Sequence, residues 1–429
     1  MPRPGRGRAP AERSRESIVA VSLLRVAEPL PEAPPETRPQ TVPVAEPVLR
    51  QRILHVFRAP VGGLFRHVVD AARMQAEAGH EVGLFCDSLT GGARAEAALA
   101  GLAPRLALGL TRVPMRRNPH ATDLAALVRL HGLVRRIRPT VLHGHGSKGG
   151  LYARLVPGPF GVAAPVRAYT PHGGSFNYHP GTPLHRLYMA VEGLLSLRTD
   201  VFLFESAYIA GRHRAFVGPT DRLVRIVHNG LDTAEFAPIA PAAERHDLVY
   251  IGELREAKGV PVLFDALARL RDHGRVLSLL VVGSGPDEAT LKARVAELGL
   301  DGAVTFEPPQ PIRQALSRGT VMVVPSLAES LPYVVLEAVA AAQPLVSTDV
   351  GGIPEILGPA ADALVPPNDF IALAGALARK LDQSPEARAG EAAALSAFVR
   401  CRFSMRQMTD DGLAGYAAAR PPSPVPAQA

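Results

Sequence analysis

Two glutamates, Glu329 and Glu337, are the residues whose type and spacing most directly indicate chemistry in this chain. They belong to the stretch PSLAESLPYVVLE, which follows an apolar run at 321–324 and predicts a helix beginning at Ser330. At about 100° per residue, a separation of eight positions places both carboxylates along one side of that helix start. The free backbone N–H groups of a helix start bind anions. Two acids beside an anion site predict a ligand with phosphates and hydroxyls, that is, a sugar nucleotide.

The surroundings of Glu337 are apolar from Val334 to Val339. A carboxylate in that position needs a partner, and the hydroxyls of a ribose would serve. The alternative is a helix start favoured by the helix dipole, followed by a solvated acid. We favour the functional interpretation of the pair.

Further candidates lie in two segments that supply glycines and cations. Gly62 and Gly63 follow a predicted strand and open a helix, where glycine lets the backbone approach a phosphate closely, although an ordinary turn has the same sequence. The segment YIGELREAKG places Arg255 and Lys258 at a strand end, where cations would neutralise a departing diphosphate. A solvated basic helix start is the alternative for this segment.

A second glycine loop, VVGSGP, contains Gly285. Ala289 and Thr290 stand where a dinucleotide motif needs its third glycine, so the sequence does not support nicotinamide binding. A nucleotide-facing turn and a plain tight turn both remain open for Gly285.

Three histidines, His143, His145 and His172, fall at predicted strand ends. The first two could bind a metal, but the sequence shows no third ligand with suitable spacing, so a structural or hydroxyl-binding role is favoured. His172, followed by two glycines, is the better site candidate, with a satisfied core histidine as its alternative. No Asp-x-Asp stands at a strand end, and we therefore expect no metal and no other cofactor.

The elements that position these residues alternate between short β-type runs and helical patterns, which predicts parallel, doubly wound sheets. The first series of predicted strands covers 53–57, 82–85, 141–145, 166–170 and 201–204. The second series covers 248–251, 277–282, 304–306, 321–324, 344–347 and 363–365. Two series predict an α/β protein with two Rossmann-like domains, in which the ligand lies at the carboxyl ends of the strands.

The predicted organisation has five parts. A Pro/Arg-rich arm, expected to be disordered, is followed by two Rossmann-like domains, a last helix that could cross back to the first domain, and a Pro-rich tail. Their predicted bounds are 1–50, 51–235, 236–402, 403–420 and 421–429, with a proline-containing linker at 229–246.

Composition limits the class of protein. The chain has 429 residues, 47% of them hydrophobic and 20% charged, and a net charge of +7, which fits a globular enzyme with an acidic ligand. Without tryptophan or an aromatic-studded basic motif, nucleic acid is disfavoured as a partner. Cys86 and Cys401 are isolated, no apolar run reaches the ~20 residues of a membrane span, and we see no secretory signal. We expect a cytoplasmic protein, with peripheral contact at the inner membrane face left open.

These residues resemble a known family, the retaining glycosyltransferases of family 4 with the GT-B fold, of the type that assembles bacterial polysaccharides. The resemblance extends from about residue 53 to 410 and follows the family's order of motifs. Those motifs are GGLFRHVVDAARMQAEAGHEV, VLHGHGSKGG, TPHGG, FES, VHNGLD, YIGELREAKGV, VVGSGPDEATLKARVAELGL and the E-x7-E of Glu329 and Glu337.

The resemblance implies a role for each matched position. Phosphate contacts would come from Gly62, Gly63 and Lys258, and from amides near Ser330 and Leu331. Glu329 would meet hydroxyls of the donor sugar, Glu337 would hold the ribose, and His172 would lie near the anomeric centre or its 6-hydroxyl. Gly285 and Glu307 would border the base. Many members have arginine where Glu253 stands, and Arg255 would have to replace that cation.

The implied reaction is sugar transfer from a nucleotide diphosphate to an acceptor hydroxyl, with retained configuration and without metal. The implied partners are the nucleotide-sugar donor and a saccharide or lipid-linked saccharide acceptor. A sugar-nucleotide epimerase, an inverting transferase and a non-catalytic GT-B scaffold are the alternatives that the sequence leaves open.

Overall fold

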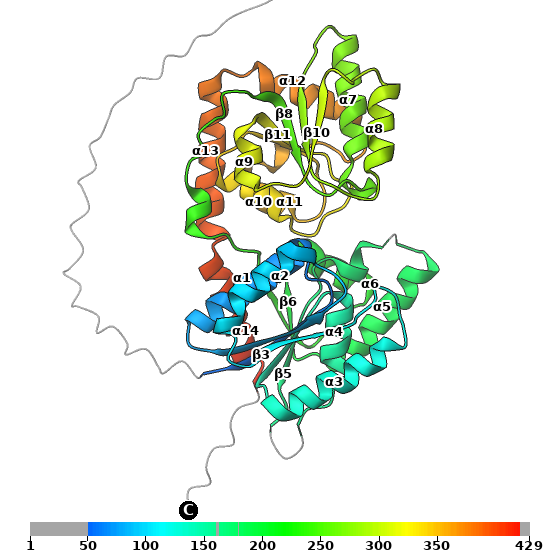
Figure 1. The fold of residues 1–429 in the computed structure, drawn as a ribbon, viewed down its shortest axis with the longest axis vertical. Coiled ribbons are helices and arrows are strands. Elements are labelled where there is room, and N and C mark those ends of the chain that lie inside the picture. Colours follow the sequence, from blue (N-terminus) through cyan, green and yellow to red (C-terminus); the bar gives the residue numbers. More distant parts are fainter. Residues whose placement is uncertain (1–49, 160–162, 179, 421–429) are drawn as a thin grey trace, which may run out of the picture. The chain divides into compact units, whose positions relative to one another are not determined.

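Two parallel β-sheets organise the chain. The computed structural model describes residues 50–159, 163–178 and 180–420, and many of its elements are labelled in Figure 1. The first sheet has seven strands in the order β3-β2-β1-β4-β5-β6-β7, and the second has five in the order β10-β9-β8-β11-β12. Every strand pair in both sheets is parallel. This confirms the predicted α/β architecture with two Rossmann-like sheets.

The strands are short, as expected for parallel strands between crossover helices. They are β1 (Arg52–Phe57), β2 (Glu81–Asp87), β3 (Gly109–Val113), β4 (Val141–His145), β5 (Val166–Thr170), β6 (Val201–Phe204), β7 (Leu223–Ile226), β8 (His246–Ile251), β9 (Leu279–Val282), β10 (Val304–Glu307), β11 (Gly319–Val324) and β12 (Leu345–Ser347).

The α-helices follow the strands along the chain. They are α1 (Gly62–Glu77), α2 (Gly92–Leu102), α3 (Thr122–Ile137), α4 (Gly146–Leu155), α5 (Pro183–Ser196), α6 (Ala207–Phe216), α7 (Val260–Asp272), α8 (Glu288–Glu297), α9 (Ile312–Ser317), α10 (Tyr333–Ala340), α11 (Ile353–Leu357), α12 (Phe370–Asp382), α13 (Pro385–Arg402) and α14 (Met405–Ala418). Short 3-10 helices are η1 (Ala103–Arg105), η2 (Gly174–Asn177), η3 (Thr233–Phe236), η4 (Glu256–Lys258) and η5 (Gly358–Ala363).

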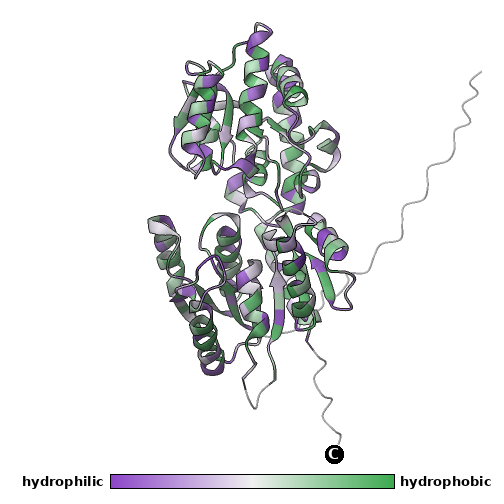
Figure 2. Cartoon of the chain, turned by 90° about the vertical axis from the view of Figure 1, so that its right-hand side faces the viewer, coloured by the Kyte–Doolittle hydropathy of each residue, from purple (hydrophilic) through white to green (hydrophobic). Residues whose placement is uncertain are grey.

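Helices cover both faces of each sheet, so most residues of the central strands are buried. The four residues of β9, LLVV, are all buried, as are the four of β6, VFLF. Most helices carry hydrophilic and hydrophobic residues on different sides, as Figure 2 shows. The core is therefore divided into layers on the two faces of each sheet.

Helix α4 packs very closely on the first sheet. A Cβ on Gly149 would lie 2.3 Å from the carbonyl oxygen of Val56 in β1, and a Cβ on Gly150 would lie 2.2 Å from the ring of Tyr169 in β5. The glycines of the GSKGG segment are thus required where the helix meets the strands, because no side chain fits there.

The last helix, α14, packs against the first sheet although it follows the second in sequence. Met405, Met408 and Tyr416 share a buried cluster with residues of β1, β4, β5 and β6. The Tyr416 hydroxyl also lies 2.8 Å from His143 Nδ1 at the end of β4. Figure 1 shows α14, in red, beside α1. The first sheet's core therefore contains residues from both ends of the described chain.

The sequence prediction and the structure differ at three strands. Strands β3 and β7 were missed because both lie at sheet edges, where few of their residues are fully buried and the apolar pattern is weak. The predicted strand at 363–365 is instead the end of η5, and Val365 forms only an isolated bridge to Thr348. The predicted arm and tail lie outside the described residues, apart from Arg50. No helix in the described part of the chain is long and apolar enough to cross a membrane.

Each sheet has one point where the strand order reverses. In the first sheet it lies between β1 and β4, and in the second between β8 and β11. The loops that leave two such strands run to opposite faces, which opens a crevice at their carboxyl ends. The topology therefore places candidate sites in the loops after β1 and β4 and in the loops after β8 and β11.

Candidate active site

Lys258 and Glu329 meet at the reversal point of the second sheet. Lys258 ends η4 after β8, and Glu329 lies in the loop after β11. Lys258 Nζ donates to Glu329 Oε1 at 2.7 Å, and Ser326 Oγ donates to the same oxygen at 2.7 Å. Glu329 is buried, whereas the Lys258 side chain is 21% exposed. The structure thus brings together two predicted site residues from distant segments, with the cation reaching solvent.

The helix after β11 begins at Tyr333 and not at Ser330 as predicted. Pro332 takes the N-cap position in an extended conformation. A proline disfavours helical geometry in the residue before it, so the helix does not extend back through Leu331. Glu329 consequently lies outside the helix, and the argument from the eight-residue spacing is wrong. Ser330 and Leu331, predicted to offer helix-start amides, lie in the loop.

The free amides of α10 are those of its first two residues. The N–H of Val335 already donates to the carbonyl of Pro332 at 3.2 Å, which leaves Tyr333 and Val334 as the orphan donors of the helix start. The anion-binding helix start that the sequence predicted is therefore present, three residues further along the chain.

Glu337 lies on α10 and pairs with Arg66 of α1. Arg66 also donates to both carboxylate oxygens of Glu235, at 2.6 and 2.7 Å, and its guanidinium lies 4.3 Å from the centre of the Tyr333 ring. Burial raises the pKa of Glu337 to about 7, against the opposing charge of Arg66. The protein itself therefore supplies a partner for this carboxylate, and the contact with a ribose stays a prediction.

The two glycines after β1 face the same helix start. Gly62 has a φ of +66°, a backbone conformation that favours glycine. A Cβ on Gly63 would come 3.3 Å from the ring of Tyr333. The predicted phosphate-binding turn at Gly62 and Gly63 thus lies against Tyr333, the first residue of α10. The turn and the free amides of this helix start are therefore close together.

Of the predicted base-bordering residues, Gly285 lies in the loop after β9 and Glu307 ends the neighbouring strand β10. A Cβ on Gly285 would lie 2.2 Å from the carbonyl oxygen of Leu254, so close packing of two backbones explains this glycine. The carbonyl of Glu307 accepts from the N–H of Gly283 at 3.0 Å, and its carboxylate accepts from Arg318 Nη2 at 2.8 Å. The side-chain hydrogen bond from Arg318 lowers the pKa of Glu307.

Arg255 and Glu253 form an exposed ion pair at the rim. Arg255 Nε lies 3.4 Å from Glu253 Oε2, and both side chains are about half exposed, at 44% and 50%. Arg255, the cation expected to act in place of the family's arginine, is thus paired with Glu253, the residue that stands at that arginine's position. The structure does not bring Arg255 to the Lys258–Glu329 pair among the contacts of the described residues.

His172 is held in a left-handed backbone conformation, with a φ of 51°, by a buried carboxylate. The N–H of Gly173 donates to Glu205 Oε1 at 2.6 Å. Burial raises the pKa of Glu205 to about 7, while hydrogen bonds from Gly173, His172 and the Ser330 hydroxyl oppose the rise. Its second oxygen, Oε2, is buried without a hydrogen-bond partner among the described residues. Glu205 thus couples the His172 turn to Ser330 in the loop before α10.

A chain of hydrogen bonds fixes the tautomer of His172. His55 Nε2 lies 2.8 Å from Gln75 Oε1, which can only accept, so the neutral His55 ring accepts at Nδ1. His145 Nε2 lies 2.9 Å from that nitrogen and must donate to it, and His172 Nε2 then donates to His145 Nδ1 at 3.0 Å. The chain leaves the lone pair on His172 Nδ1. Burial lowers the pKa values of all three rings, which keeps them neutral.

The structure brings further histidines to His143 and His145, which the spacing in the sequence did not show. Two sets of three rings bring nitrogen atoms within 4.8 Å of one another, namely His55 with His143 and His145, and His67 with His145 and His172. The residues His55 and His67 come from β1 and α1, so only the fold unites them with the strand ends. Hydrogen bonds already engage these rings, including His143 to Thr170 at 2.9 Å and His67 to Asn229 at 3.0 Å.

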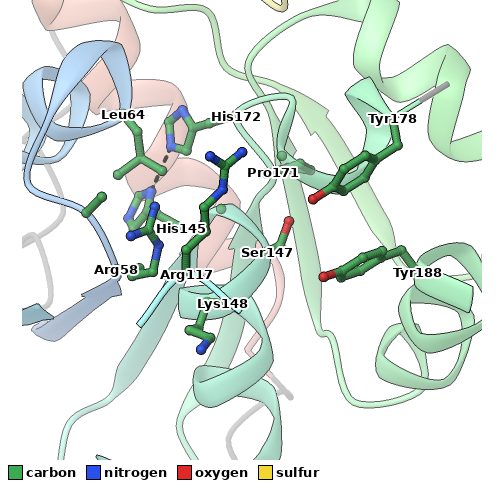
Figure 3. A pocket seen from close by; sticks show the side chains of 13 residues that line it. Arg58, Leu64, Arg117, His145, Ser147, Lys148, Pro171, His172, Tyr178 and Tyr188 are labelled. Carbon is green, nitrogen blue, oxygen red and sulfur yellow. Dashed lines mark hydrogen bonds between the residues drawn. The ribbon is translucent and has the colours of Figure 1, made fainter. Parts of the chain in front are cut away.

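A pocket opens at the reversal point of the first sheet. It has a volume of about 220 Å³ and is bordered by the ends of β1 and β4, the first turn of α4 and the His172 turn. Figure 3 shows Arg58, Arg117 and His172 on one side of it, and the hydroxyls of Tyr178 and Tyr188 pointing in from the other. The Tyr178 and Tyr188 rings stack with centroids 5.2 Å apart. His172 therefore borders a pocket with the polar and aromatic side chains that suit a saccharide.

The sequence prediction did not include several residues of this site, among them Arg66, Glu205, His55 and His67. Glu205 stands in the FES motif, where a polar residue at the end of an apolar strand was the available signal. Arg66 and His67 follow the glycine pair by one helical turn, which places them near the same site. His55 lies inside a buried strand and has no local signal.

The comparisons with known proteins agree with this geometry. Residues 61–235 match the family described as Glycosyltransferase Family 4, and residues 245–383 match the family described as Glycosyl transferases group 1. The chain is 31% identical over 263 residues to the putative glycosyltransferase EpsD of Bacillus subtilis, covering 57% of this chain and 68% of EpsD. It is 27% identical over 383 residues to glycogen synthase of Mycobacterium tuberculosis, covering 82% and 87% of the two chains.

Solved structures share the fold at low sequence identity. Sucrose-phosphate synthase of Thermosynechococcus elongatus superposes with a TM-score of 0.69 at 21% identity, over 86% of this chain and 99% of that one. HepE of Anabaena, in complex with UDP-glucose, superposes with a TM-score of 0.70 at 17% identity, over 86% and 100%.

Proposed function

Because this chain belongs to glycosyltransferase family 4 and is a glycosyltransferase, we propose that it moves a sugar from a nucleotide-diphosphate donor to a hydroxyl of a saccharide acceptor, with retained anomeric configuration. The observation that carries the proposal is the Lys258–Glu329 pair at the reversal point of the second sheet, next to the free amides of α10. The HepE complexes with UDP and UDP-glucose support the choice of donor.

The proposed division of labour follows from charge. Lys258 and the amides of Tyr333 and Val334 stabilise the negative charge that develops on the departing diphosphate. Glu329 accepts hydrogen bonds from hydroxyls of the donor sugar, and Ser326 keeps this carboxylate oriented. Because a lysine and a helix start supply positive charge there, we propose that the transfer does not require a metal.

The bond changes can be written without a covalent intermediate. The bond from the anomeric carbon to the phosphate oxygen breaks, and its electron pair stays on the diphosphate. The acceptor oxygen forms the new bond on the same face, and its proton passes to an oxygen of the departing phosphate. In this proposal the acceptor occupies the pocket at the reversal point of the first sheet, which His172 borders. The Nδ1 lone pair of His172 accepts a hydrogen bond from a sugar hydroxyl and so positions it.

The proposed setting is the assembly of a polysaccharide on a lipid-linked saccharide at the inner membrane face. One relative, WcaL of Escherichia coli, is named as a putative colanic acid biosynthesis glycosyltransferase, and is 30% identical over 42% of this chain and 47% of WcaL. A helix face with exposed leucines is present on α5, at Leu184, Leu187 and Leu194. Exposed arginines Arg186 and Arg198 flank it and would attract anionic lipids.

Replacing Lys258 tests the proposal. We expect Lys258→Ala to lower kcat/KM by roughly 10²–10³-fold with little change in melting temperature, since it removes a cation that acts on the developing charge. The assay is nucleotide release across a panel of donors, with the anomeric configuration of the product read by NMR. Lys292→Ala, which removes an exposed lysine from α8, is the matched control. Wild-type turnover by Lys258→Ala, or an inverted product, would refute the proposed mechanism.

A further inference from the structure

The pocket beside His172 has an unbalanced charge. Its thirteen lining residues include Arg58, Arg117 and Lys148 and no aspartate or glutamate. Lys148 is already neutralised, because its Nζ lies 2.8 Å from Asp123 Oδ1 and also donates to two carbonyl oxygens. The unbalanced charge therefore resides on the two guanidinium groups.

Arg58 and Arg117 lack a carboxylate partner in the described part of the chain. Asp87 is the acid whose charge raises the pKa of Arg58. Its carboxylate is occupied by its own loop, since it accepts from the N–H groups of Leu89 and Met115 at 3.0 and 2.7 Å. Burial lowers the pKa of Arg58, the charge of Asp87 opposes this shift, and the charge of Arg117 adds to it. Two like charges converging on one pocket favour an incoming anion.

The backbone on the pocket's floor favours an anion too. The first turn of α4, from Gly146 to Lys148, lines the pocket, and its N-cap residue His145 gives no side-chain hydrogen bond to the helix start. The amides of this turn have no acceptor within the helix. Guanidinium forks and free amides together are the donors that bind carboxylate and phosphate in proteins.

Size and lining limit what carries the anion. At about 220 Å³, the pocket is below the roughly 300 Å³ of the smallest ordinary ligand sites, so it suits one sugar ring with its substituent. Tyr178 and Tyr188 offer ring edges and hydroxyls across from the arginines (Figure 3). His172 borders the same pocket, so the anion would lie within one sugar residue of the reacting centre.

We propose that this pocket recognises an oxyanion on the acceptor, so that the enzyme glycosylates an acidic saccharide. The inference rests on the proposed function, since it names the acceptor class of the same site. A uronic-acid carboxylate and a sugar or lipid phosphate share the required chemistry. Arg58 and Arg117 hold the oxyanion, the first turn of α4 donates to it, and the tyrosines contact the ring.

Calorimetric titration with glucuronate, glucose 1-phosphate and glucose tests the proposal on the full chain. We expect the two anions to bind at least about tenfold more tightly than glucose, and Arg117→Gln and Arg58→Gln each to remove most of that difference. Binding of only one anion identifies the carboxylate or the phosphate as the natural group. Arg129→Gln, an equal charge change on the exposed face of α3, and Lys258→Ala in the donor site should keep the preference.

Two results overturn the inference. One is equal binding of glucose and the anions by the wild-type chain, and the other is an unchanged preference for anions in both arginine variants. Arg117 is exposed, so its variant should fold even if Arg58→Gln does not. Nucleotide release from the donor panel without added acceptor reports on the donor half alone. If release persists while the anions show no preference, the acceptor inference fails and the proposed function stands.

Discussion

Glu205 shows how a single buried carboxylate couples distant parts of the site. It is fully buried and joins the His172–Gly173 turn to Ser330, but one of its oxygens has no partner in the described structure. The desolvation that this burial causes raises its pKa to about 7. The folded chain therefore holds a proton on Glu205 that the unfolded chain releases at lower pH.

This pKa gives a pH dependence with a definite sign. Because the folded pKa lies above the unfolded value of 4.5, the folded state binds more protons between pH 4.5 and 7, and stability falls as the pH rises through this range. Glu205→Gln removes that contribution. We expect the melting temperature of Glu205→Gln relative to the wild type to be higher at pH 8 than at pH 5.

The control is Glu288→Gln on the exposed side of α8, whose melting temperature relative to the wild type should be the same at both pH values. An equal relative melting temperature for Glu205→Gln at the two pH values would contradict the raised pKa.

At this scale the sequence could identify residues but not their partners. Glu329 and Lys258 were both predicted as site residues, yet their hydrogen bond could not be foreseen, since 71 positions separate them. Arg66, which pairs with Glu337 from 271 positions away, was not predicted at all. Side-chain pairs of this kind depend on where loops from separate strands meet, and residue patterns carry no information on that meeting.

At the scale of elements, glycine distinguishes two helices of the first sheet. Gly149 in α4 lies against the backbone of β1, whereas a Cβ on Gly132 in α3 would meet no atom within 4 Å. We expect Gly149→Ala to destabilise the fold by more than about 2 kcal/mol, because the helix must move away from the strand. Gly132→Ala should stabilise it by roughly 0.5–1 kcal/mol, through helix propensity. Urea unfolding measures both, and equal effects of the two variants would contradict the packing described.

Helix α5 allows a test of membrane contact. Leu187 and Leu194 are 60% and 69% exposed on the helix that carries Arg186. If this face meets a lipid surface, the double variant Leu187→Asp/Leu194→Asp should lower binding to phosphatidylglycerol vesicles at least about tenfold in a sedimentation assay. Val276→Asp, at an apolar residue that is 72% exposed, serves as the control. Unchanged binding by the double variant, or equal binding of wild-type protein to neutral phosphatidylcholine vesicles, would exclude this face as the contact.

At the scale of the whole molecule, the C-terminal helix completes the core of the N-terminal sheet. The hydrogen bond between Tyr416 and His143 joins residues that are 273 positions apart, and both side chains are buried. The predicted final helix is thus an integral part of the first sheet's packing. The core of that sheet is complete only when the chain has returned from the second one.

Removing the Tyr416 hydroxyl should therefore be costly. Tyr416→Phe keeps the ring but leaves His143 Nδ1 without its hydrogen-bond partner. We expect a loss of about 1–3 kcal/mol in the free energy of unfolding, measured in urea. Tyr208→Phe removes a hydroxyl that is only partly buried, 3.2 Å from Arg212, and should cost less. If both variants unfold alike, the contact between α14 and β4 does not contribute as described.

The sequence by itself determined most strands of the two series, the helix after each glycine turn, and the residue types of the donor half. These depend on local periodicity and on turn chemistry, which the order of residues carries directly. Only the tertiary structure decided that five histidines converge, that Arg66 pairs with Glu337, and that Arg58 and Arg117 share a pocket without an acid. Parallel strands bring together the ends of segments that lie far apart in the chain, so such clusters follow from strand order, which no local pattern encodes.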